Sequence, residues 1–185
     1  MLRGMRIVHV VFACMVVSVP AFALEVRETR TQLVFDVPSA WVVTHIGEYV
    51  RARAPDRHFT VALSGLEEGH PTYQAPDAEK FLLDGVRISG WVQVTDVKVD
   101  VHARAVSWGN LAGFETFGTG KMTNDYDTSF APCNWMAVLL VDKTNPQKAV
   151  RIVGIGTPAG YTANEPGIYT ALHSLHPAPV TSASH

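Results

Sequence analysis

Hydrophobic and polar residues alternate along much of the chain after residue 30, which is the pattern of half-buried β-strands. Three early segments show it most clearly, over residues 31–37, 49–54 and 59–63. In the second of these segments Arg51 and Arg53 take the polar positions, so we expect them to face away from the core. Pro38 ends the first strand, and Trp41 follows in the turn region.

The hydrophobic spacing then changes to that of an amphipathic helix. One face would carry Ala78, Phe81, Leu82 and Val86. Asp77 is placed to cap the helix at its N-terminus, and Gly90 is placed to end it. The pattern predicts a helix over residues 78–89.

The second half of the chain returns to strand patterns, interrupted by a polar loop over 124–132. The predicted strands are 91–101, 104–108, 114–122 (with bulges at its glycines), 134–142 and 149–157. The segment 134–142 is apolar on both faces, which predicts a central strand covered on both sides. A polar connector containing Pro146 joins it to 149–157, which predicts an antiparallel hairpin. Pro166 is suited to the first turn of a last helix that runs to His176.

These elements predict an α+β fold. We expect a mostly antiparallel sheet of about seven to nine strands, with one central helix and one short C-terminal helix packed on it. A chain of 185 residues has room for one such domain. We expect a signal peptide over 1–23, a single domain over 24–176 and a flexible tail over 177–185.

The first 23 residues have the features of a secretory leader. Arg3 and Arg6 precede an apolar stretch over 7–19, and Ala21-Phe22-Ala23 has the small-x-small pattern of a cleavage site. A helix of that apolar stretch would reach about 20 Å, less than the roughly 30 Å of a membrane core. We therefore expect cleavage after Ala23, a periplasmic or secreted protein, and no membrane span afterwards.

Charge and cysteine content narrow the function further. Arg3 and Arg6 are two of the 15 Lys and Arg residues, so residues 24–185 carry 13 of them against 17 Asp and Glu. An acidic balance of this kind excludes a general nucleic-acid binder. Cys14 follows a lipobox-like Val11-Phe12-Ala13, which leaves lipidation open. Without Cys14, Cys133 is the only cysteine, so no disulfide can form within the domain.

The order of elements resembles the Mog1/PsbP-like family, which has exported bacterial members. The resemblance rests on the entry segment Phe35-Asp36-Val37-Pro38-Ser39-Ala40-Trp41, the single central helix, Leu111-Ala112-Gly113-Phe114 and the hairpin 134–157. It implies an accessory or partner-binding protein, and it assigns no catalytic residues.

Several residues carry candidate chemistry, but none completes a catalytic or cofactor motif. Gly118-Thr119-Gly120-Lys121 is followed by Met122, so it cannot be a phosphate-binding P-loop. The segment Asp125–Asp127 lacks the glycine and glutamate of an EF-hand, although an irregular cation site stays open. His173 and His176 have a spacing that could hold a metal on one helix face. Cys133 could act as a nucleophile only beside a histidine.

Trp41 and Trp108 lie at predicted element ends, where half-exposed indole rings could contact a partner or ligand. Our main hypothesis is an exported, non-enzymatic protein that binds a protein partner or a small apolar ligand and needs no cofactor. The alternatives are a hydrolase acting on the cell envelope and a metal-handling protein that uses His173 and His176.

Overall fold

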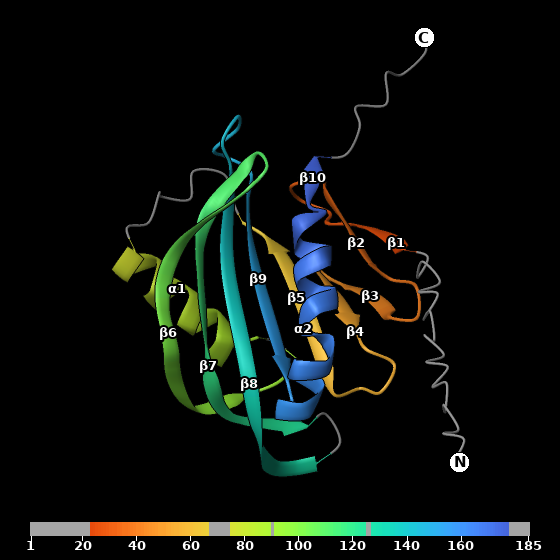
Figure 1. The fold of residues 1–185 in the computed structure, drawn as a ribbon, viewed down its shortest axis with the longest axis vertical. Coiled ribbons are helices and arrows are strands. Elements are labelled where there is room, and N and C mark those ends of the chain that lie inside the picture. The colour runs from red at the N-terminus through yellow and green to blue at the C-terminus, as the bar shows by residue number, and fades with distance from the viewer. Residues whose placement is uncertain (1–22, 67–74, 90, 125–126, 178–185) are drawn as a thin grey trace, which may run out of the picture.

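The computed structural model describes residues 23–66, 75–89, 91–124 and 127–177. Within these ranges the chain forms ten strands and two helices, which confirms the α+β class (Figure 1). Several predicted features lie outside the described residues. These are the leader with Cys14, the helix stop at Gly90, Asp125 in the candidate cation loop, and the tail from residue 178.

The strands form two antiparallel sheets. The larger sheet has seven strands in the order β3-β4-β5-β9-β8-β7-β6, and the smaller has three in the order β1-β2-β10. The bounds are β1 (Ala23–Arg27), β2 (Leu33–Pro38), β3 (Val42–Ile46), β4 (Tyr49–Arg53), β5 (Phe59–Gly65), β6 (Val94–Trp108), β7 (Leu111–Asn124), β8 (Asp127–Asp142), β9 (Ala149–Gly156) and β10 (His176–Pro177). β2, β4, β5 and β9 agree closely with the predicted strands.

β8 occupies the inner position that its sequence predicts. It pairs with β7 on one side and with β9 on the other, and the hairpin with β9 is antiparallel. Trp135 and Ala137 belong to a core shared with the first helix. Met136 and Val138 belong to a second core shared with the last helix. The two apolar faces of this strand therefore define two separate cores.

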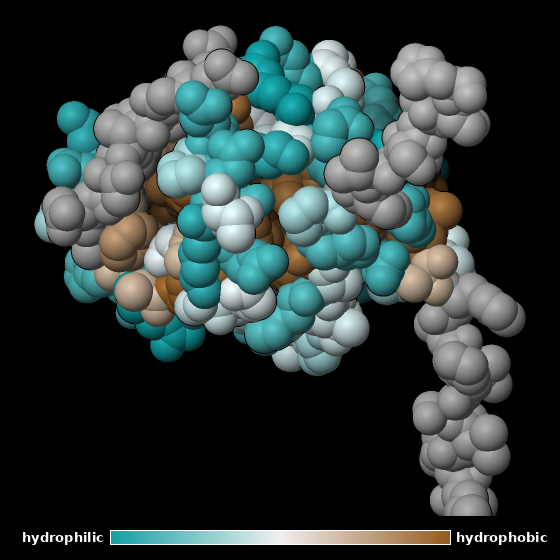
Figure 2. Space-filling view, turned by 90° about the horizontal axis from the view of Figure 1, so that it is seen from above, coloured by the Kyte–Doolittle hydropathy of each residue, from teal (hydrophilic) through white to brown (hydrophobic). Residues whose placement is uncertain are grey.

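The two helices cover opposite faces of the large sheet (Figure 1). α1 (Ala75–Arg87) inserts the fully buried Ala78, Leu82 and Val86 against β6–β9. α2 (Pro158–His173) buries Ile168 and Leu172 on the other face, where the small sheet also packs. Seen from one end, polar residues surround hydrophobic residues that show between the layers (Figure 2). No helix in the described part of the chain is both long enough and apolar enough to cross a membrane.

Three predictions about the strands are wrong. β6 is one continuous strand where two were predicted, because register shifts bend it without ending it. β8 begins at Asp127, so most of the predicted loop over 124–132 is strand paired with β7. The bulges lie mainly along β6, not at the glycines of β7. A Cβ built on Gly118 would collide with the Lys98 carbonyl oxygen and the Trp135 indole, so this glycine permits close packing.

The helix boundaries also differ from the predictions. α1 begins at Ala75, so Asp77 lies in the first turn, where its charge still favours the helix, and not at the cap. α2 begins at Pro158, and the Thr157 hydroxyl caps it by accepting from the Gly160 N–H at 3.1 Å. Pro166 therefore lies inside the helix. Proline was a misleading start signal, because packing of the apolar side of α2 outweighs the loss of one helical hydrogen bond.

Candidate functional site

The two tryptophans predicted to contact a partner lie in different environments. Trp41 is 7% exposed and packs against Phe59, with ring centroids 6.0 Å apart. The half exposure expected for it is therefore wrong, and its ring is part of the core. Trp108 is half-buried, and its ring lies 4.9 Å from the His173 ring. A partner-binding role for Trp108 stays a prediction.

The two histidines of the metal hypothesis do not share a helix face. α2 ends at His173, and His176 lies in β10, which pairs with β2. His176 Nδ1 lies 2.7 Å from the Ser174 carbonyl oxygen. Among the described residues there is no cluster of three or more His, Cys, Asp or Glu side chains that could hold a metal ion. The predicted pairing of these two histidines was wrong because the helix stops one turn too early.

Cys133 is placed as a core residue. It is 1% exposed and packs in the core beneath α1, with Val94 and Trp135. Burial raises the pKa of its thiol to about 11. The neutral thiol is a weak nucleophile, so this environment does not activate the residue for catalysis.

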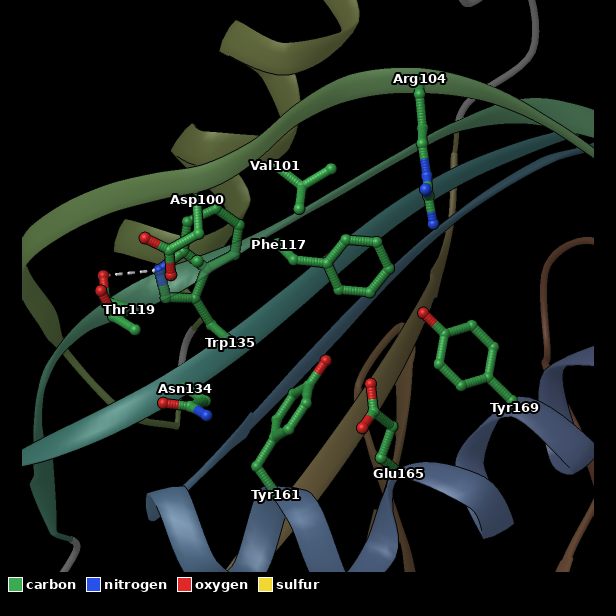
Figure 3. A pocket seen from close by; sticks show the side chains of 11 residues that line it. Asp100, Val101, Arg104, Phe117, Thr119, Asn134, Trp135, Tyr161, Glu165 and Tyr169 are labelled. Carbon is green, nitrogen blue, oxygen red and sulfur yellow. Dashed lines mark hydrogen bonds between the residues drawn. The ribbon is translucent and has the colours of Figure 1, made fainter.

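A hollow of about 320 Å³ lies between α2 and the strands β6, β7 and β8. We call it the tyrosine hollow, after Tyr161 and Tyr169. These side chains and Glu165 project from α2 toward the strands, while Phe117 and Arg104 approach from the other side (Figure 3). The α2 residues are spaced by four, which places them on one face of the helix. Asp100 completes the strand side.

Arg104 connects the rim of the hollow to a buried carboxylate. Its Nε and Nη2 atoms donate to Glu115 Oε1 at 2.8 and 2.7 Å. The Glu115 side chain is 6% exposed, so the arginine supplies the charge that this buried group needs. The guanidinium also lies 5.7 Å from the centre of the Phe117 ring. Glu115 thus neutralises Arg104, and Asp100 and Glu165 remain to give the hollow a negative character.

The pKa values of Tyr161 and Tyr169 are raised by the burial and the negative charge of this hollow. Burial raises the pKa of Tyr161 and of Tyr169, and the negative charges of Glu115 and Glu165 raise both further. Both phenols are therefore neutral hydrogen-bond donors at physiological pH. Among the described residues, no hydrogen bond is formed by either hydroxyl or by the Glu165 carboxylate. The Trp135 indole, by contrast, is already bonded to the Thr119 carbonyl oxygen at 2.9 Å (Figure 3).

None of the residues that line the tyrosine hollow was predicted from the sequence to bind a partner. The last helix was predicted to begin beside Pro166, which left Tyr161 outside it and hid the spacing of the three α2 residues. An earlier helix start at Thr157-Pro158 was the signal available, since threonine followed by proline is a good capping sequence. The contribution of Asp100 and Phe117 could not be found from sequence, because it depends on the curvature of β6 and β7.

The arrangement of these elements defines the class of protein: a seven-stranded antiparallel sheet between two helices, the Mog1/PsbP-like fold. The chain resembles cyanobacterial PsbP (CyanoP) from Synechocystis with a TM-score of 0.54 and 14% identity, over 89% of this chain and 96% of that one. It resembles the Ran-binding protein Mog1p of Saccharomyces cerevisiae with a TM-score of 0.56 and 10% identity, over 85% and 96% of the two chains. Neither a family model nor a curated protein matches the sequence. At identities this low, the similarity shows the shared fold alone. This shared fold confirms the resemblance predicted from the sequence.

Proposed function

We propose that this protein is exported and acts without catalysis, as a binding or accessory protein that holds a basic segment of a protein partner in the tyrosine hollow. The observation that carries the proposal is the hollow itself. It joins aromatic rings to the carboxylates of Asp100 and Glu165, and its two phenol hydroxyls have no hydrogen-bond partner among the described residues.

A lysine or arginine side chain suits this set of groups. Its charge would be attracted to Asp100 and Glu165, and its N–H groups would find carboxylate acceptors. The rings of Phe117 and the two tyrosines would contact its alkyl stem or lie beneath its charge. Clusters of aromatic residues beside charged groups commonly carry most of the energy of a protein interface. Mog1p, which shares the fold, is named as a Ran-binding protein, so the fold is compatible with protein recognition.

A small apolar ligand has less support. Between α2 and the strands β2 and β5, the space lined by Phe35, Trp41 and Leu172 holds only about 10 Å³. A volume of that size accommodates about one water molecule, so this apolar layer is filled by its own side chains. The polar hollow on the other side of α2 is thirty times larger.

The position of β1 fits an exported form. β1 begins at Ala23, and this residue pairs with Pro38 at the very end of the strand. Cleavage after Ala23 would remove one terminal pair and keep the pairing of residues 24–27 with β2. Intact-mass measurement of the protein recovered from the periplasm tests this step, and a mass that includes the leader would contradict it.

A photocrosslinking experiment tests the binding site. A benzoylphenylalanine placed at Tyr169 should give a discrete protein adduct in living cells, and the same residue at Thr144, exposed in the β8–β9 connection, should not. The double substitution Asp100→Asn and Glu165→Gln should abolish the adduct while leaving the thermal midpoint within a few degrees. The proposal fails if both crosslinking positions give the same products, or if neutralising the two carboxylates changes nothing.

A further inference from the structure

A second hollow, of about 250 Å³, lies on the opposite face of the large sheet, beyond the end of α1. We call it the arginine pocket. Its charged lining is entirely basic, from Arg51, Arg53, Arg57 and His58, and Trp91 and Thr157 close it. Among the residues that the structure describes, no aspartate or glutamate lines it. This is unexpected in a domain whose overall charge is negative.

The strand register explains how the basic groups come together. Arg51 and Arg53 are two residues apart on β4, so they project from the same face. Arg53 is paired with Thr60 on β5, and Thr60 with Ile155 on β9, which places all three in one row across that face. Arg57 lies in the tight turn between β4 and β5 with a φ of 63°, a conformation that non-glycine residues rarely adopt. The turn therefore presents Arg57 at the end of that row.

The three guanidinium groups have no carboxylate partner among the described residues. Arg87 and Arg104, elsewhere on the surface, pair with Asp84 and Glu115. The nearest described acid in the sequence is Asp56, and its carboxylate accepts the backbone N–H of His58 at 3.0 Å. Like charges gathered without counterions repel one another. An anion bound among them would offset this repulsion.

Trp91 provides an independent observation. Its indole Nε1 is buried and has no hydrogen-bond partner, the one such side-chain atom found among the described residues. A buried indole N–H normally finds an acceptor, and one left without an acceptor destabilises the fold. Trp91 lines the arginine pocket, so a turn of its ring that brings this N–H to a bound acceptor would satisfy the donor. Thr157, the N-cap of α2, adds the positive end of a helix dipole to the same wall.

We propose that the arginine pocket binds a phosphoryl group carrying about two negative charges. A single carboxylate is satisfied by one bidentate arginine, whereas this pocket gathers three arginines and a buried N–H donor. A phosphoryl group offers up to three terminal acceptor oxygens and the charge to match. The group could belong to a soluble phosphate compound or to a membrane lipid. The inference is independent of the tyrosine hollow, because the two sites share no residue.

Calorimetric titration of the intact chain with inorganic pyrophosphate at low ionic strength tests the site, with acetate as the monovalent control. We expect saturable binding of pyrophosphate that is much tighter than that of acetate and that weakens as salt is added. Arg53→Gln should weaken binding at least about tenfold, because a charge-assisted bond is lost. Trp91→Phe keeps an aromatic ring but removes the N–H donor, and it should weaken binding several-fold. Arg27→Gln removes an exposed arginine on β1 and should leave binding unchanged.

Two further arms separate the sources and the sites. Flotation with vesicles of phosphatidic acid and phosphatidylcholine, compared with phosphatidylcholine alone, shows whether a lipid-borne phosphoryl group is also accepted. Asp100→Asn should bind pyrophosphate like the wild type, so failure of the tyrosine hollow would not affect this result. The proposal is overturned if neither pyrophosphate nor the phosphatidic acid vesicles bind, if acetate binds equally well, or if Arg27→Gln weakens binding as much as Arg53→Gln.

Discussion

The pair formed by Arg104 and Glu115 gives a sharp test of how the tyrosine hollow is stabilised. The two residues face each other across β6 and β7, and one carboxylate oxygen accepts both arginine bonds. Arg104→Met keeps much of the side-chain stem over Phe117 but leaves Glu115 buried without its partner. Breaking a fully buried pair costs about 3–5 kcal/mol, and an unsatisfied buried polar group about 1–3 kcal/mol. The Arg104 side chain is 62% exposed, so solvent weakens the pair. We therefore expect Arg104→Met to lower the free energy of unfolding by about 2 kcal/mol.

Removing the carboxylate of the pair should cost less stability than removing the arginine. Glu115→Leu leaves Arg104 free to be solvated, so we expect a loss below about 1 kcal/mol. The double variant removes both charges and should be more stable than Arg104→Met alone by about 1–2 kcal/mol. Urea unfolding followed by tryptophan fluorescence gives all three values, and the thermal midpoint of Arg104→Met should fall by about 4–8 °C. A double variant no more stable than Arg104→Met would refute this account of the buried carboxylate.

Three further predictions follow from buried groups outside the hollow. With a pKa of about 11, Cys133 should be a thiolate in only about one molecule in a thousand at pH 8, so a thiol reagent should modify it after unfolding in urea and not before. Glu28 is completely buried and accepts hydrogen bonds from the backbone N–H and the hydroxyl of Thr31, at 2.6 and 2.5 Å. Glu28→Ala should therefore lower the unfolding free energy by about 2–4 kcal/mol in a urea titration, whereas the exposed Glu25→Ala should change it by less than about 0.5 kcal/mol. Burial opposes ionisation of Asp142, but hydrogen bonds from Thr144 and the next residue outweigh it and lower the pKa. Its contribution to stability is thus present above pH 4 and lost as the pH falls further, so Asp142→Asn should destabilise at pH 7 and much less near pH 3.

The outcomes that would contradict these predictions are equally direct. Fast labelling of Cys133 in the folded protein would show that the core beneath α1 opens readily. An unfolding free energy for Glu28→Ala equal to that for Glu25→Ala would show that the turn after β1 does not depend on its carboxylate. A penalty for Asp142→Asn that stays constant from pH 7 to pH 3 would show that the charge of Asp142 does not stabilise the fold.

Local sequence patterns were sufficient to predict the strands whose own residues form a clear buried hydrophobic face. The alternation over 49–54 and 59–63 predicted β4 and β5, and the doubly apolar segment 134–142 predicted the central strand. β3 was missed because Val42 is exposed and the strand lies at the edge of the described sheet, paired with β4, so it lacks a clear buried face. β1 was missed for a similar reason, since only Val26 of its five residues is buried. Strands of this kind are defined by pairing with a neighbour, which no local pattern reveals.

The sequence alone determined the α+β class, the two faces of β8 and the resemblance to the Mog1/PsbP-like family, because hydrophobic periodicity is encoded by residues close together in the chain. Only the tertiary structure decided the sites. The tyrosine hollow joins α2 to β6 and β7, and the arginine pocket joins β4 and its turn to Trp91 and the start of α2. Residues that far apart in sequence are brought together by strand order and sheet curvature. These depend on the sum of many weak contacts, and no single segment of the chain specifies them.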